Sequence, residues 1–385
     1  MATVSRRGLL LGGAAGVGSA AAGAVAALSL VDSAPAPAAV PPVAVEPFHG
    51  ARQAGVATEP QAHGLFCAFE LEPEVDRAAL ARLMRLLSDD AARLTRGAAA
   101  LADTEPELAA SPARLTVTFG FGPGLYAAAG LDSPVAELPA FAVDRLEPRW
   151  SGGDLLVQVC ADDALTAAHA RRMLVKDARA FASVRWTQRG FRGGPGAVGT
   201  QRNVLGQLDG TANPVAGTPA FDTAVWRPDG STTLVVRRIR AELDTWAAAD
   251  RSVREMSIGR RLDTGAPLTG TAEHDAPDFA ARDALGIPVI HTASHIRIAH
   301  VGTDDRRILR RPYNYDEGPA ADGEPDTGLI FASYQADVER QFTPIQQALS
   351  DGDLLNKWVT PIGSAVFAIP PGCGEDGWVG EGVLG

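Results

Sequence analysis

Residues 155–188 read LLVQVCADDALTAAHARRMLVKDARAFASVRWTQ, and they carry the clearest secondary-structure signal in the chain. The run Leu155–Cys160 is continuous and rich in Leu and Val, as in a buried strand. Residues 164–181 have the apolar spacing of a helix, and Ser183–Gln188 alternates like a second strand. The stretch therefore predicts a β-α-β unit.

The same order of elements occurs upstream of this unit and again in the second half of the chain. Upstream we expect a strand, a helix and a strand, at Gly64–Leu71, Glu74–Arg96 and Leu115–Phe121. After Asn213-Pro214 we expect a strand, a long helix, two strands, a helix and a last strand, at Thr233–Arg238, Glu242–Leu262, His295–His300, Gly328–Gln335, Asp337–Leu349 and Ala365–Ile369. Two α+β halves of similar make-up predict a duplicated ferredoxin-like fold with antiparallel sheets. The duplication depends on element order alone, because the halves share no visible sequence identity.

The first forty residues differ in kind from the rest. Ser5-Arg6-Arg7-Gly8-Leu9 leads into an Ala/Gly-rich apolar run that reaches about Val31 and is followed by small residues and prolines. The run is long enough for a membrane anchor, but its weak hydrophobicity, the paired arginines and the small-residue tail favour a cleaved twin-arginine signal. We therefore divide the chain into a signal and linker at 1–40, an N-terminal domain at 41–215 and a C-terminal domain at 216–385.

This signal predicts export to the periplasm, the cell envelope or the medium. The twin-arginine route carries proteins that have already folded, often around a cofactor, so a cofactor is expected before any site is found.

Composition limits the partners and the metal chemistry. The chain has 385 residues, 46% of them hydrophobic, which is enough for the cores of about two domains. Its formal net charge is −11, and removal of the signal with its two arginines and one aspartate leaves about −12, which argues against nucleic acid as a partner. Cys67, Cys160 and Cys373 cannot all pair with one another, and none lies in a C-x-x-C or C-x-x-C-H motif. We expect three small buried hydrophobic residues, and neither a zinc or iron–sulfur site nor a covalently attached haem.

Three stretches carry side chains that catalysis requires. Gly206–Pro214 (GQLDGTANP) places one carboxylate, Asp209, between glycines that allow tight turns and close approach of a ligand. The second stretch is His291–His300 (HTASHIRIAH), which lacks the glutamate of a zinc-protease motif. The residues after His295 alternate like a strand, and a histidine at a strand end can be an axial ligand of haem iron. Arg306–Tyr315 (RRILRRPYNY) is a basic cluster in an acidic chain. Taken singly, the three are also compatible with a plain turn, a core histidine and solvated arginines.

Taken in order, these stretches resemble the motifs of the dye-decolourising peroxidases. G-x-x-D-G is matched by Gly206–Gly210, S-H-I-R-[IL]-A by Ser294–Ala299, and L-R-R-x-Y-x-Y by Leu309–Tyr315. Further matches are Phe48-His49-Gly50, Gln53-Ala54-Gly55, Thr118–Pro123, Val235–Arg240, Gly265-Ala266-Pro267 and Gly328–Phe331. The resemblance extends from Pro47 to Pro371, and it points to the twin-arginine-exported, iron-uptake-associated subclass.

The resemblance implies a peroxidase with non-covalent haem b, bound mainly by the C-terminal half. It makes His295 the proximal ligand of the iron, Asp209 the distal acid–base carboxylate and Arg310 the distal arginine. The residues that it places along the haem are Gly210, Thr211, Ala212 and His300. The chain departs from the family pattern at Arg52, where His is frequent, and at Val301-Gly302, where Pro-Arg is frequent. Both departures put contacts at the haem edge in doubt.

Peroxide cleavage requires a base for one proton, its return to the leaving oxygen, and a fixed positive charge near the breaking bond. An unperturbed Asp titrates near pH 3.9 and His near 6.5, so an aspartate base predicts best turnover of bulky dyes at acidic pH. A hydrogen-bond acceptor that orients the other ring N–H of His295 is also expected. Leu329 and Phe331 are expected either to wall the distal pocket or to pack in the core.

The expected partners are hydrogen peroxide, a reducing organic donor such as a dye or phenol, and components of iron uptake; a homo-oligomer is also open. Because large dyes do not enter a small pocket, oxidising equivalents are expected to reach the surface through aromatic side chains, with Tyr313, Tyr315, Tyr334 and Trp358 as candidates. Two alternatives stay open: a haem carrier or deferrochelatase-like iron-handling protein, and a ferredoxin-like module without cofactor. A carrier has no need for both Asp209 and Arg310.

Overall fold

The N-terminal half is a four-stranded antiparallel sheet with two long helices. The computed structural model describes residues 44–193, 199–300, 306–320 and 323–385. The strands of this half are β1 (His63–Leu71), β2 (Thr116–Phe121), β3 (Leu155–Ala161) and β4 (Ala182–Phe191), in the order β2-β3-β1-β4. Helix α1 (Arg77–Thr95) begins after Asp76, whose side chain accepts from the N–H of Ala79, and α3 (Ala164–Ala178) begins after Asp163, which accepts from Thr166.

The C-terminal half repeats this arrangement. Its strands are β5 (Thr232–Ala241), β6 (Leu309–Arg310), β7 (Tyr313–Pro319), β8 (Pro325–Gln335) and β9 (Val359–Ile369). They pair antiparallel in the order β9-β5-β8, and β6 and β7 both pair with β8. The helices are α5 (Leu243–Ala248), α6 (Arg251–Ile258), α7 (His295–Ile298) and α8 (Thr343–Gly352). In both halves the last strand lies beside the first, so the expected duplicated ferredoxin-like fold is confirmed.

The remaining helical segments are short. They are α2 (Pro123–Ala128), α4 (Pro219–Val225), α9 (Glu381–Leu384), a π turn at Val338–Phe342, and 3-10 turns at Pro106–Leu108, Pro148–Trp150 and Leu354–Lys357.

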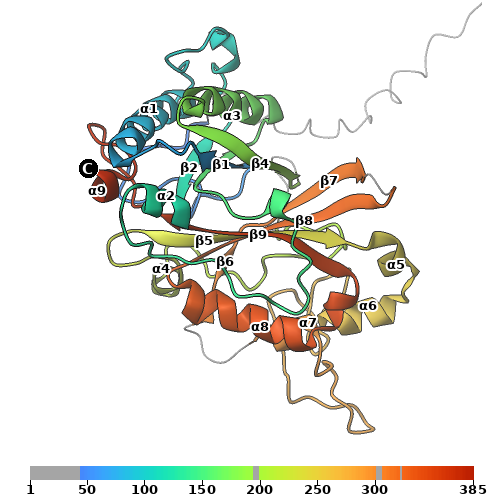
Figure 1. Cartoon of the computed structure of the whole chain (residues 1–385). Coiled ribbons are helices and arrows are strands. Elements are labelled where there is room, and N and C mark those ends of the chain that lie inside the picture. Colours follow the sequence, from blue (N-terminus) through green and yellow to red (C-terminus); the bar gives the residue numbers. More distant parts are fainter. Residues whose placement is uncertain (1–43, 194–198, 301–305, 321–322) are drawn as a thin grey trace, which may run out of the picture. The chain divides into compact units, whose positions relative to one another are not determined.

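The two half-sheets join at both edges. Phe121 of β2 pairs with Ala368 of β9, and Phe191 of β4 pairs with Asn314 of β7. Because β5 also pairs with β8, eight strands of the described residues close on themselves like a barrel, and β6 is added beside β8. Figure 1 shows α1 and α3 over the N-terminal half-sheet, and α8 on the opposite side, over the C-terminal half-sheet.

Strand alternation divides the apolar side chains into layers. Leu65, Cys67 and Phe69 of β1 face α1 and α3, whereas Phe66 and Ala68 of the same strand face the interior between the half-sheets. A third, smaller cluster forms around Trp246 and Trp358 beside the C-terminal helices. As expected, Cys67, Cys160 and Cys373 are free thiols, and all three are buried.

Several sequence expectations need correction. The expected strand at His295–His300 is wrong, because α7 is a helical turn in which the N–H groups of Ile298 and Ala299 donate to the carbonyls of Ser294 and His295. The long helix expected at Glu242–Leu262 is broken into α5 and α6, since Ala249 has an extended backbone. Strand β7 was not expected, because prolines and charged residues interrupt its pattern.

The expected signal at 1–40 and the departure at Val301-Gly302 lie outside the described residues. Within the ranges that the structure describes, we find no helix with the length and apolar character that crossing a membrane requires. The division at residue 215 stays a prediction.

Candidate active site

The imidazole of His295 is held by a buried carboxylate. His295 is the first residue of α7, and Asp353 directly follows α8. The distance from His295 Nδ1 to Asp353 Oδ2 is 2.6 Å, and only 3% of the Asp353 side chain is exposed. The other oxygen, Oδ1, accepts from the backbone N–H of Leu355 at 2.9 Å. The carboxylate therefore fixes the ring and occupies Nδ1, which leaves Nε2 as the nitrogen that can bind a metal.

Electrostatics around His295 follow from this contact. Burial disfavours the charged imidazole, but the charge of Asp353 and its hydrogen bond outweigh burial and raise the pKa of His295. The charges of Arg310 and Asp209 also act on this ring, in opposite directions. The three residues taken from the family motifs thus belong to one electrostatic site.

Asp209 and Arg310 form a direct ion pair. Arg310 Nη1 lies 2.6 Å from Asp209 Oδ1, although the two residues are 101 positions apart. Arg310 is in β6, whose backbone is clamped by Asn213: the Arg310 N–H donates to Asn213 Oδ1 at 3.0 Å, and Asn213 Nδ2 donates to the Arg310 carbonyl at 2.7 Å. The second oxygen of Asp209 accepts a long, 3.5 Å contact from Asn203 Nδ2. One short loop, residues 206–213, therefore positions both the carboxylate and the guanidinium.

Glu273 ties this loop to the neighbouring segment. Its Oε1 accepts from Thr211 Oγ1 at 2.8 Å and also from the hydroxyl of Thr200. Burial opposes ionisation of Glu273, but these two hydrogen bonds and nearby positive charges lower its pKa, so it is a carboxylate. Sequence reasoning missed Glu273, Asp353 and the clamp made by Asn213, because none of these contacts is local in sequence.

The other residues expected along the haem have different surroundings. Gly210 has φ +131°, a conformation that side-chain-bearing residues rarely adopt, so the turn after Asp209 depends on glycine. Thr211 is bound to Glu273, Ala212 is exposed, and exposed His300 packs on Phe279 with ring centroids 5.3 Å apart.

Arg52 stands at the position where the family pattern often has histidine. It pairs with Asp222 at 2.8 Å and lies over the Trp226 ring. Arg52 is therefore engaged within the protein.

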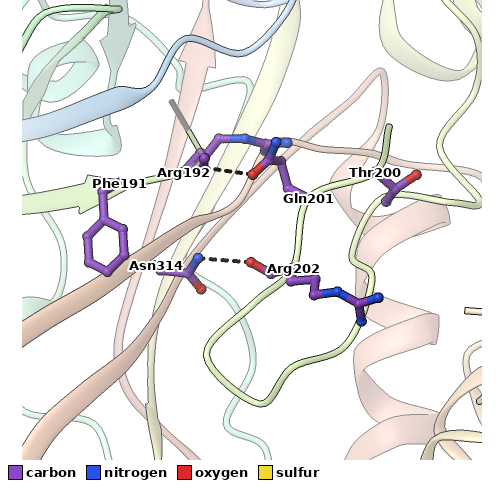
Figure 2. A pocket seen from close by; sticks show the side chains of 7 residues that line it. Phe191, Arg192, Thr200, Gln201, Arg202 and Asn314 are labelled. Carbon is purple, nitrogen blue, oxygen red and sulfur yellow. Dashed lines mark hydrogen bonds between the residues drawn. The ribbon is translucent and has the colours of Figure 1, made fainter. Parts of the chain in front are cut away.

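A surface cavity leads toward Asp209. It has a volume of about 440 Å³ and is lined by Phe191, Arg192, Gly193, Thr200, Gln201, Arg202 and Asn314. In Figure 2, Asn314 points to the backbone of Arg202, and its Nδ2 donates to that carbonyl at 3.1 Å. A narrow crevice shares Arg192, Gln201, Arg202 and Asn314 with the cavity and extends to Asp209 and Leu329. A molecule close to water in size, such as hydrogen peroxide, fits this crevice better than a dye does.

The donor set fits haem better than it fits a protein-ligated ion. Among the residues in the described ranges, no three or more His, Cys, Asp or Glu side chains gather in a way that holds a metal. A porphyrin would supply four nitrogen ligands of its own and need a further donor from the protein, and His295 Nε2 would be that donor.

Comparison with known proteins agrees with this site. The model "Dyp-type peroxidase, N-terminal" matches residues 53–192, and "Dyp-type peroxidase, C-terminal" matches residues 200–374. The chain belongs to the Dyp-type peroxidase family. Its C-terminal match begins before Asp209, so the carboxylate loop lies within the second family model.

Relatives of this peroxidase carry two kinds of name. A dye-decolorizing peroxidase from Thermobifida fusca is 40% identical over 319 residues, which cover 77% of this chain and 74% of that protein. A deferrochelatase from Escherichia coli K12 is 34% identical, with 85% and 84% covered. The crystal structure of a DyP-type peroxidase from Cellulomonas bogoriensis is 49% identical with a TM-score of 0.87, and covers 90% of this chain and 99% of that one. This peroxidase is therefore a haem oxidoreductase that uses hydrogen peroxide and a reducing substrate.

The four aromatic candidates for carrying oxidising equivalents are buried. Tyr313, Tyr315 and Tyr334 are at most 1% exposed, and Trp358 is 8% exposed. A bulky donor cannot touch them directly, and electron transfer through any of them stays a prediction.

Proposed function

We propose that this peroxidase binds haem b non-covalently through His295 and activates hydrogen peroxide with Asp209 and Arg310. The observation that carries the proposal is the 2.6 Å Asp209–Arg310 pair, whose charges act on an imidazole already oriented by Asp353. Non-covalent attachment is supported by the absence of a C-x-x-C-H motif and by the burial of all three cysteines.

Bound haem supplies a redox-active iron that can accept electrons from organic donors and pass them to peroxide. Asp209 would take a proton from one peroxide oxygen and return it to the other, which leaves as water when the O–O bond breaks. Two electrons and two protons from the reducing donor convert the remaining oxygen into a second water. Arg310 keeps a fixed positive charge beside the oxygen on which negative charge develops. Asp353 keeps the His295 proton on Nδ1, and Nε2 stays free to bind the metal.

The proposed donors are dyes, phenols and related reducing compounds. The crevice at Asp209 admits small molecules, so we expect these bulky donors to react from outside it. The motif at Arg6-Arg7 supports export by the twin-arginine route to the periplasm, the cell envelope or the medium.

A deferrochelatase-like role in iron uptake is the second candidate, and it is favoured by the 34% identity to the Escherichia coli protein. It predicts release of iron from haem with the porphyrin left intact.

One set of measurements separates these functions. Purified holoprotein is expected to show a Soret band that is lost or displaced in His295→Ala, and to oxidise an anthraquinone dye only when peroxide is present. Asp209→Asn and Arg310→Leu should keep the band and lose most of the oxidation. A haem spectrum with no peroxide reaction would indicate a carrier, and free porphyrin with released iron would indicate a deferrochelatase.

A further inference from the structure

Tyr313 occupies a site built around its ring. It begins β7, lies between the two half-sheets and is 1% exposed. A side chain at Gly64 of β1 or at Gly190 of β4 would collide with Tyr313, and Phe66 packs edge-on against the ring at 6.0 Å. Gly64 and Gly190 are cross-strand partners, so the tyrosine crosses two strands whose glycines leave room for it.

The ring lies against Gly64, the cross-strand partner of Cys160. Gly64 pairs with Gly190 on one side and with Cys160 of β3 on the other, so the three positions lie in one row across the half-sheet. Cys160 is fully buried in the same interior cluster as Tyr313. The Tyr313 hydroxyl makes no regular hydrogen bond to a described residue, and the Cys160 thiol is a polar group that it faces. By contrast, the Tyr334 hydroxyl donates to Gln158 Oε1 at 2.7 Å.

The Tyr313 phenol is protonated in this environment. Burial and the neighbouring thiol raise the pKa of Tyr313 well above its ordinary value, against the opposing charge of Arg311. A phenol that cannot ionise in place loses an electron only together with its proton.

Arg192 connects this pair to the active site. Its guanidinium lies 5.9 Å from the centroid of the Tyr313 ring and donates to the carbonyl of Pro312 at 3.0 Å. The same arginine lines the crevice that contains Asp209. Tyr313 also follows Arg310 by three residues, so the pair and the peroxide site share one segment of chain.

We propose that Tyr313 and Cys160 form an internal electron donor, which is oxidised when hydrogen peroxide is turned over without an external reducing substrate. The inference rests on the proposed peroxidase function, because it takes its oxidant from that reaction. Its products stay at a defined buried position.

The proposed oxidation removes two electrons and two protons from the pair. Tyr313 gives up one electron and its hydroxyl proton, and Cys160 gives up one electron and its thiol proton. Two electrons and two protons convert one hydrogen peroxide, whose O–O bond breaks, into two waters. The sulfur then bonds to the ring carbon beside the hydroxyl, and the hydrogen of that carbon restores the phenol. The net change is a Cys160–Tyr313 thioether that is lighter than the separate residues by two hydrogens.

The test adds hydrogen peroxide to the holoenzyme with no donor, unfolds the protein, alkylates free thiols with iodoacetamide and maps the peptides by mass spectrometry. We expect Cys160 to become resistant to alkylation and to appear in a peptide joined to Tyr313, while Cys67 and Cys373 stay reactive. Tyr313→Phe keeps the ring and should leave Cys160 reactive; Tyr334→Phe is the matched control and should behave like the wild type. An excess of reducing donor should protect Cys160.

A second measurement detects the loss of the first electron from Tyr313. Freeze-quench electron paramagnetic resonance should show a tyrosine radical that disappears in Tyr313→Phe and persists in Tyr334→Phe. A fully alkylated Cys160 after turnover, or an unchanged radical in Tyr313→Phe, would overturn the proposal while the peroxide-dependent Soret change leaves the peroxidase function intact. Loss of the Soret change itself would overturn both.

Discussion

Asp353→Asn tests the anchoring of the proposed haem ligand. The carboxylate has two tasks, because Oδ2 accepts from His295 Nδ1 at 2.6 Å and Oδ1 accepts from the Leu355 N–H at 2.9 Å. An asparagine has one acceptor oxygen and can perform only one of them. If its oxygen serves Leu355, its NH2 group faces His295 Nδ1, and the imidazole proton moves to Nε2, the nitrogen that must bind the metal. If its oxygen serves His295, the Leu355 N–H loses its partner.

The size of the effect follows from the loss of one outer-shell hydrogen bond. Such a loss lowers metal affinity or activity by about 10- to 100-fold, which corresponds to about 1.4–2.7 kcal/mol. We expect Asp353→Asn to transfer haem to excess apomyoglobin correspondingly faster, and to react more slowly with peroxide. Asp351→Asn is the matched control, since Asp351 is an exposed carboxylate two residues away that accepts from Gln347. Equal haem transfer in the two variants would refute the proposed anchoring.

Three further predictions concern the supports of the site and the N-terminal helices. Asn213→Ala should lower the rate of reaction with peroxide about 10-fold, because β6 loses two hydrogen bonds that fix Arg310. Stopped-flow absorbance measures this rate, and an unchanged rate would contradict the clamp. Glu273→Ala should reduce that rate and Glu273→Gln should restore much of it, since Gln keeps an acceptor for Thr211; equal rates in the two variants would argue against a positioning role. Burial and the neighbouring carboxyl of Asp90 raise the pKa of Asp177 to about 7, above its value in the unfolded chain. Between about pH 4 and 7 the native state therefore holds a proton on Asp177 that the unfolded state has lost. The free energy of unfolding falls as the pH rises through this window. Asp177→Asn cannot ionise, so its free energy of unfolding relative to the wild type should be higher at pH 8 than at pH 5, as measured by chemical denaturation. The same difference at both pH values would exclude this assignment.

Sequence pattern predicted most of the fold because strands and helices in the N-terminal half have strong periodicity. The expected strand at Leu155–Cys160 and helix from Ala164 begin where the structure has them. Pattern failed around His295, where a four-residue helical turn is too short to show a period and its alternation imitates a strand. Closure of the two half-sheets through single residue pairs leaves no sequence signature either.

Only the site residues that lie within the family motifs were predictable from the sequence. Asp209, His295 and Arg310 were identified from ordered motifs, and the structure brings Asp209 and Arg310 into contact. Asp353 was not predictable, because its role depends on a contact across 58 residues, and an aspartate that follows a helix is common in sequence. The pairing of Tyr313 with Cys160 depends in the same way on strand order, which places β1, β3 and β4 side by side.

The most direct test of the account is the second-order rate constant for hydrogen peroxide, measured by stopped-flow absorbance at pH 5 on wild type, Asp209→Asn and Arg310→Leu holoproteins with equal haem content. General acid–base catalysis contributes about 10²- to 10⁴-fold, so we expect Asp209→Asn to react at least 100-fold more slowly while its Soret band is unchanged. A rate within about three-fold of the wild type in both variants would contradict the assignment of Asp209 and Arg310 as the groups that cleave peroxide.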